Sequence, residues 1–133
     1  MILGLADVRD WLKGFGIGEH FYIGKLDAKQ EKSIGVYQRT SSGRPRVAIG
    51  GLDLTKYDVK QISILVHWSN NARETEEAAR TLFDKLRAID RVTIGCTRID
   101  YLCLEVSEPV DVGTDDTGVY ERTILFDLYY ERM

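Results

Sequence analysis

The sequence of 133 residues has little proline and lacks low-complexity stretches, long apolar runs and a signal peptide. It contains two prolines and no low-complexity stretch, which disfavours a long disordered tail. It contains no run of about 18 apolar residues, so no membrane-spanning segment is predicted. The first residues lack the basic start and apolar core of a signal peptide, so we expect the chain to stay in the cytoplasm where it is made.

Disulfide partners and metal ligands are equally scarce. The two cysteines, Cys96 and Cys103, are seven residues apart, and the two histidines, His20 and His67, are distant from them. A structural zinc site needs about four ligands, usually in close pairs. In an extended segment the two cysteines would lie about 23 Å apart, too far for a disulfide. We therefore expect reduced thiols, no metal and no other cofactor.

The formal net charge of -3 argues against a general nucleic-acid binder. The charge is uneven along the chain. Residues 1–60 carry 10 Lys+Arg and 7 Asp+Glu, giving +3, whereas residues 61–133 carry 8 and 14, giving -6. A basic half and an acidic half suit head-to-tail contact between copies. The alternative is that both charges mix on one folded surface.

Hydrophobic periodicity predicts two helices. Apolar residues recur at helical spacing over Met1 to Phe15, and glycines follow directly. A second apolar stripe runs over Ala72 to Ile89, with Asn71 as N-cap and Glu74 as its capping-box partner. Acidic residues lie near the start of this helix and basic residues near its end, which suits the helix dipole.

Alternating or β-rich segments predict five main strands: His20–Leu26, Ser33–Gln38, Gln61–Trp68, Ile99–Val106 and Val119–Tyr130. We expect the first two to form a hairpin through Asp27–Lys32, and the last two to form a long hairpin that includes the turn Gly113–Gly118. The segment Arg39–Tyr57 is predicted to be irregular, apart from a brief strand at Val47–Ile49. The prediction is one α+β domain over residues 1–133: a mostly antiparallel sheet of about five strands with two helices on one face.

The other face of this sheet is predicted to be exposed and partly aromatic. Aromatic residues are enriched in protein interfaces, so this face is a candidate for contact with another subunit. Alternation places on it Ser63, His67, Tyr101, Thr123, Asp127 and Tyr129.

Each candidate catalytic motif lacks the neighbouring structure or sequence pattern that its chemistry requires. The glycines of Gly14–Gly18 follow a predicted helix, whereas a phosphate-binding loop follows a strand and opens a helix. His67, Ser69 and Asp100 are the residue types of a hydrolase triad, but no serine lies in a G-x-S-x-G pattern. We therefore predict that the chain is not an enzyme. A small hydrolase or nuclease using His67 or His20 is the alternative.

Two charged loops hold the predicted partner-binding residues. Arg39, Arg44 and Arg46 cluster in the long irregular segment, where they would meet an acidic neighbour or passing DNA, or stay solvated. Asp115 and Asp116 lie in a glycine-flanked turn that lacks the spacing of an EF-hand loop. This pattern favours a hairpin tip over a cation site.

The segment from Tyr22 to Arg39 resembles a segment of the minor capsid proteins of tailed bacteriophages. In that family a short strand leads into a Glu-Lys-x-Ile-Gly-Val-Tyr stretch, which is present here as Glu31 to Tyr37. The strand ending in His67-Trp68-Ser69, the helix capped at Asn71 and the C-terminal hairpin are also similar to the family.

This resemblance implies a tail terminator or head–tail joining subunit from a phage or prophage. Such a subunit is expected to form a ring, often hexameric, that caps the tail tube and joins it to the head. The implied partners are other copies of the chain and the tail-tube and neck proteins, with no membrane and no specific nucleic acid. The implied location is the bacterial host cytoplasm and then the virion. A small adaptor that binds proteins through its exposed sheet or an edge strand is the alternative function.

Overall fold

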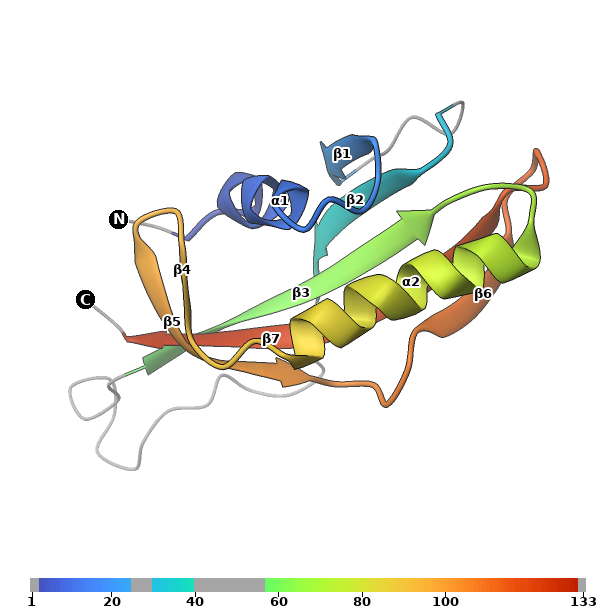
Figure 1. The fold of residues 1–133 in the computed structure, drawn as a ribbon. Coiled ribbons are helices and arrows are strands. Elements are labelled where there is room, and N and C mark those ends of the chain that lie inside the picture. Colours follow the sequence, from blue (N-terminus) through green and yellow to red (C-terminus); the bar gives the residue numbers. More distant parts are fainter. Residues whose placement is uncertain (1–2, 25–29, 40–56, 132–133) are drawn as a thin grey trace.

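The computed structural model describes residues 3–24, 30–39 and 57–131. Figure 1 shows two helices on one side of a curled sheet, which confirms the predicted α+β class. The elements are α1 (Leu5–Lys13), β1 (His20–Ile23), β2 (Ser33–Gln38), β3 (Tyr57–His67), α2 (Ala72–Arg87), β4 (Val92–Ile94), β5 (Thr97–Leu104), β6 (Val110–Thr114) and β7 (Tyr120–Glu131).

The sheet of the described residues has seven strands instead of the predicted five. Its order is β1-β2-β3-β7-β5-β4, and β6 also pairs with β7. The two strands missing from the prediction are β4 and β6. β4 has only three residues, and all five residues of β6 are exposed, so neither shows the alternation that marks a half-buried strand. All pairs are antiparallel except β1 with β2.

The predicted hairpin between the first two strands is wrong, because β1 and β2 run parallel. His20 lies opposite Ser33, and Ile23 lies opposite Val36. The start of β2 is held by β3: the Lys32 N–H donates to the Trp68 carbonyl oxygen at 2.7 Å. This anchor lies far away in the sequence, and local turn residues could not have revealed it. Part of the connection, including the predicted Asp27 turn, lies outside the described residues, as does Val47–Ile49.

Both helices end two residues before their predicted ends, α1 at Lys13 with Gly14 as its C-cap and α2 at Arg87 with Ala88 as its C-cap. Gly16 and Gly18 follow α1 with φ of 75° and 97°, a region that other residues rarely adopt. At the start of α2, the side chain of Asn71 accepts a hydrogen bond from the Glu74 N–H at 3.1 Å, as predicted. The buried residues of α2 are Thr75, Ala79, Leu82, Phe83 and Leu86.

Alternation along β3 and β7 positions the core. Ile62, Ile64 and Val66 are 0% exposed, as are Ile124 and Phe126 of β7. These even-numbered side chains form one apolar cluster with Val8 and Leu12 of α1 and with the buried residues of α2. Each fully buried aliphatic side chain contributes about 2 kcal/mol of hydrophobic stabilisation. The strand prediction for Gln61–Trp68 and its inward face are therefore confirmed.

The second face of the sheet, which carries the odd-numbered residues of β3 and β7, differs from its prediction. We call it the open face, because the apolar cluster with both helices lies on the other side. Tyr101 is 55% exposed as expected, but His67 is 0% and Asp127 only 4% exposed. Both side chains pair with charged groups from neighbouring parts of the chain, and this tertiary pairing buries them.

Candidate interaction surface

Three groups of side chains follow one another along the open face. Tyrosines gather near the end of β7, an arginine–carboxylate group occupies the middle, and a buried histidine lies at the far end of β3. The register explains this order, since Val59 lies opposite Tyr129, Gln61 opposite Asp127, and His67 opposite Glu121.

The tyrosine group consists of Tyr57, Tyr101 and Tyr129. The rings of Tyr57 and Tyr101 each lie with their centroids 5.7 Å from that of Tyr129. Tyr57 is 41% and Tyr101 is 55% exposed, so two large aromatic rings face outward. Aromatic rings with a polar hydroxyl are typical of surfaces that contact other proteins.

The middle group is built around Asp127, whose carboxylate pairs with the guanidinium of Arg39. Arg39 follows β2, and its N–H donates to the Gln61 carbonyl oxygen at 3.0 Å, so its side chain reaches over β3 to β7. Burial raises the pKa of Asp127, and a hydrogen bond with Glu105 acts in the same direction, while Arg39 opposes them. Arg39 is therefore held by its own chain, and the open face is tied across three strands.

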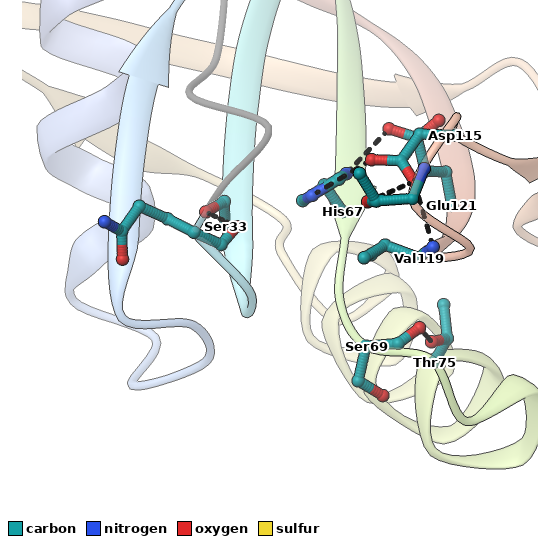
Figure 2. A network of polar contacts seen from close by, with 9 residues as sticks. Ser33, His67, Ser69, Thr75, Asp115, Val119 and Glu121 are labelled. Carbon is teal, nitrogen blue, oxygen red and sulfur yellow. Dashed lines mark hydrogen bonds and ion pairs between the residues drawn. The ribbon is translucent and has the colours of Figure 1, made fainter.

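His67 lies between two carboxylates at the end of β3 (Figure 2). Its Nδ1 is 2.9 Å from Glu121 Oε2, and its Nε2 is 3.7 Å from Asp115 Oδ2. Glu121 lies at the start of β7, and Asp115 directly follows β6. A single buried ring therefore joins β3 to both sides of the turn between β6 and β7.

Asp115 organises this turn from within. Its Oδ1 accepts hydrogen bonds from the Thr117 N–H, the Thr117 hydroxyl and the Val119 N–H, each at 2.9 Å. Burial alone would raise the pKa of Asp115, but the hydrogen bonds from Val119 and Thr117 and the nearby His67 together lower it. Asp116 is exposed, so it is the residue of this pair that faces solvent.

The three residue types of a hydrolase triad have separate partners. Ser69 Oγ accepts from the Asn71 N–H at 3.3 Å, next to the start of α2. Asp100 pairs with Arg98 at 3.4 Å on β5. His67 holds Glu121, as Figure 2 shows. Within the described ranges, no group of three His, Cys, Asp or Glu residues has an arrangement that could hold a metal ion.

The predicted partner-binding residues therefore fall into different settings. Arg39 and Asp115 make contacts within the chain, Asp116 is exposed, and Arg44 and Arg46 lie outside the described residues. Glu105, Glu121 and Tyr57 also lie on the open face, beyond the residues predicted there. Alternation along β7 places Glu121 on the face of Asp127, and that signal could have found it. The two cysteines are free, and Cys103 lies on β5.

The fold and this surface are those of a small α+β protein in which the buried His67 and Asp127 pair with charged groups and the exposed side chains include several large apolar and aromatic ones. Such a surface is typical of a structural, protein-contacting domain. The chain belongs to the bacteriophage tail terminator family, because the family model described as "Bacteriophage tail terminator protein" matches residues 3–132. The resemblance stated from the sequence is thereby confirmed. Members of this family have a structural role in the virion and act among other tail proteins.

Other comparisons add little. No significant match was found among curated protein sequences. Thirteen chains of solved structures match. One of them, titled by a sequence identifier alone, is 14% identical, with a TM-score of 0.36, over 96% of this chain and 89% of its own. Similarity at that level carries no argument about function. In the described residues, no helix is long and apolar enough to cross a membrane.

Proposed function

We propose that this chain is a ring-forming subunit that caps the phage tail tube and joins it to the head. The observation that carries the proposal is the tail terminator match, which covers residues 3–132 and therefore nearly the whole chain. A hexameric ring is part of the proposal, as is assembly in the host cytoplasm before incorporation into the virion. The chain would act without catalysing a reaction and without a cofactor.

The physical character of the domain supports a structural role. A subunit that ends a tube must keep its shape under load, and here the open face is tied across β2, β3 and β7 by Arg39 and Asp127. His67 fastens the β6–β7 turn in the same way. The exposed Tyr57 and Tyr101 leave an aromatic area for a partner.

The direct test is deletion of the gene from its phage, followed by electron microscopy of the particles. We expect tails of uncontrolled length or tails without heads, and recovery when the wild-type chain is supplied in trans. Normal tails of normal length on filled heads in the deletion phage would refute the proposal.

The partner-binding residues Arg39, Arg44, Arg46, Asp115 and Asp116 belong to the same proposal. If Arg44 and Arg46 meet an acidic neighbour, the double substitution Arg44→Glu/Arg46→Glu should impair assembly in the complementation assay. Lys13→Glu/Lys60→Glu is a matched control with the same change in net charge, at residues outside the predicted irregular segment. Unchanged assembly after the first double reversal would remove this pair from the interface.

A further inference from the structure

Among the described residues, the strand β6 pairs with β7 alone and leaves its other edge unpaired. All five of its residues are exposed. Val110 is 41% and Val112 50% exposed, and both belong to the few large apolar side chains that are exposed in the described residues. A free strand edge with exposed apolar side chains is a template for contact with another chain.

The charge around this strand restricts what can bind there. The segment Glu105–Glu121, here called the acidic edge, contains six carboxylates and no Lys or Arg. Because the whole chain carries -3, the other 116 residues carry +3. Two copies of the acidic edge would repel each other, so a symmetric β6–β6 contact is disfavoured. A contact with a different surface of a second copy is favoured by charge.

A second charged region, with an excess of cations, begins in the middle of α2 and extends past the C-terminal end of this helix. The segment Arg80–Asp100, here called the cationic end, has five cations and three carboxylates. Asp84 is shared by Arg80 and Arg87, at 3.2 and 3.0 Å, so one carboxylate serves two guanidinium groups. Arg91 is exposed in the loop that follows α2, and the Arg98 side chain is 69% exposed.

Distance prevents these two regions from neutralising each other within one copy. The acidic edge adjoins the start of α2, since Arg122 of β7 pairs with Glu76 at 3.7 Å. The cationic end includes the last turns of α2, and Arg87 in the last turn lies 11 residues beyond Glu76, about 16 Å along the helix axis. The Debye length at physiological ionic strength is about 8 Å, so the two charges are screened from each other within the chain.

We propose that the acidic edge of one copy docks on the cationic end of the next copy. This inference rests on the proposed ring and names the surfaces that close it. The contact is heterologous, because the two patches differ, and a heterologous contact whose rotation closes produces a ring. Val110 and Val112 supply the apolar centre of the contact, and the surrounding charges set its polarity.

The test uses two charge-reversed chains that should fail alone and succeed together. One carries Glu108→Lys, Asp111→Lys and Asp116→Lys, and the other carries Arg87→Glu, Arg91→Glu and Arg98→Glu. These side chains are exposed, and none of them contacts His67 or Asp127 in the described residues, so both variants should fold. Mass photometry and analytical ultracentrifugation measure self-association of the wild type, of each variant and of their equimolar mixture.

We expect each variant alone to associate at least about tenfold more weakly than the wild type, and the mixture to form rings of alternating subunits. A control chain carries Asp10→Lys, Glu19→Lys and Glu31→Lys on exposed residues elsewhere, with the same change in net charge as the acidic-edge variant. This control should assemble like the wild type.

The outcomes separate this inference from the proposed function. Rings formed by the acidic-edge variant alone would show that copies meet elsewhere, and this would overturn the inference while the ring-forming function stands. Failure of the mixture to recover, with the variants folded by circular dichroism, would also overturn the pairing of the two surfaces. A wild-type chain that stays monomeric both alone and on purified tails would also overturn the inference. The proposed function would still be tested separately by the tail length of the deletion phage.

Discussion

The two faces of the sheet are stabilised by different kinds of interaction. On the helix-covered face, β3 and β7 present aliphatic and aromatic side chains that are 0% exposed. On the open face, most of the alternating residues are polar or tyrosine, with Val59, Leu65 and Leu125 as apolar exceptions. The buried His67 and Asp127 of this face are paired through ionic contacts. The first face is stabilised by apolar burial, and a side chain of different size or shape there would disturb the close packing of the core. The second is held by specific pairs, which also position strands and turns relative to one another.

The largest expected effect comes from exchanging one residue of β7 on the helix-covered face. Phe126→Ala should lower the free energy of unfolding by about 3–5 kcal/mol, because it removes a fully buried ring from the core. Its neighbour Leu125 points to the open face and is only half-buried, so Leu125→Ala should cost less, about 1 kcal/mol. Urea unfolding of both variants measures the difference. Equal losses would contradict the contrast between the faces.

On the open face, the largest effect is expected at His67. His67→Ala should lower the free energy of unfolding by about 3 kcal/mol, because it leaves the Glu121 carboxylate without its buried partner. A double-mutant cycle with Glu121→Ala should show a coupling of about 1–3 kcal/mol. The same unfolding assay measures it, with hydrogen exchange of the β6–β7 turn as a local probe. Independent, additive losses would mean that the pair does not fasten the turn.

The partly buried Asp115 and the buried Asp127 should respond to pH in opposite senses. The pKa of Asp115 is lowered from its ordinary value of 3.8, so its stabilising contribution is present above that pH and is lost as the pH falls. The pKa of Asp127 is raised, mainly by burial, so stability from its neutral form is present below pH 3.8 and is lost as the pH rises through its folded pKa.

Unfolding measured between about pH 3 and 6 distinguishes the two carboxylates, since this range brackets the ordinary Asp pKa. Asp115→Asn should flatten the acid side of the stability profile, and Asp127→Asn should remove the loss of stability on the other side. If both substitutions change the profile in the same direction, the assigned environments are wrong.

The smallest effect on stability is expected at the exposed tyrosine. Tyr101→Ser should change the free energy of unfolding by about 0.5 kcal/mol or less, because the side chain is 55% exposed. If the aromatic area contacts a partner, the same substitution should reduce recovery of the deletion phage by much more than its stability predicts. Gln38→Ser is a control at another exposed strand position, outside both the acidic edge and the cationic end. Equal phage recovery for both variants would leave the tyrosine group without a role in binding.

Local sequence patterns were sufficient to predict the features that depend on a single helix or strand. The apolar stripes of α1 and α2, the Asn71 cap and the alternation of β3 and β7 were all predicted, because burial of one face imposes a period of 3.6 or 2 on the chain. The family resemblance also came from the sequence, through the Glu31–Tyr37 stretch, and the family match confirmed it.

Only the tertiary structure decided the rest. The parallel pairing of β1 with β2 is accompanied by tertiary hydrogen bonds at Lys32, whose N–H donates to the Trp68 carbonyl oxygen and whose carbonyl oxygen accepts from the Glu19 N–H. His67 looks like a surface residue of a half-polar strand, yet it is buried, because carboxylates from both sides of the β6–β7 turn converge on it. A period of two says which side of a sheet a residue faces. What covers that side is determined by strands and turns that meet only when the whole chain has folded.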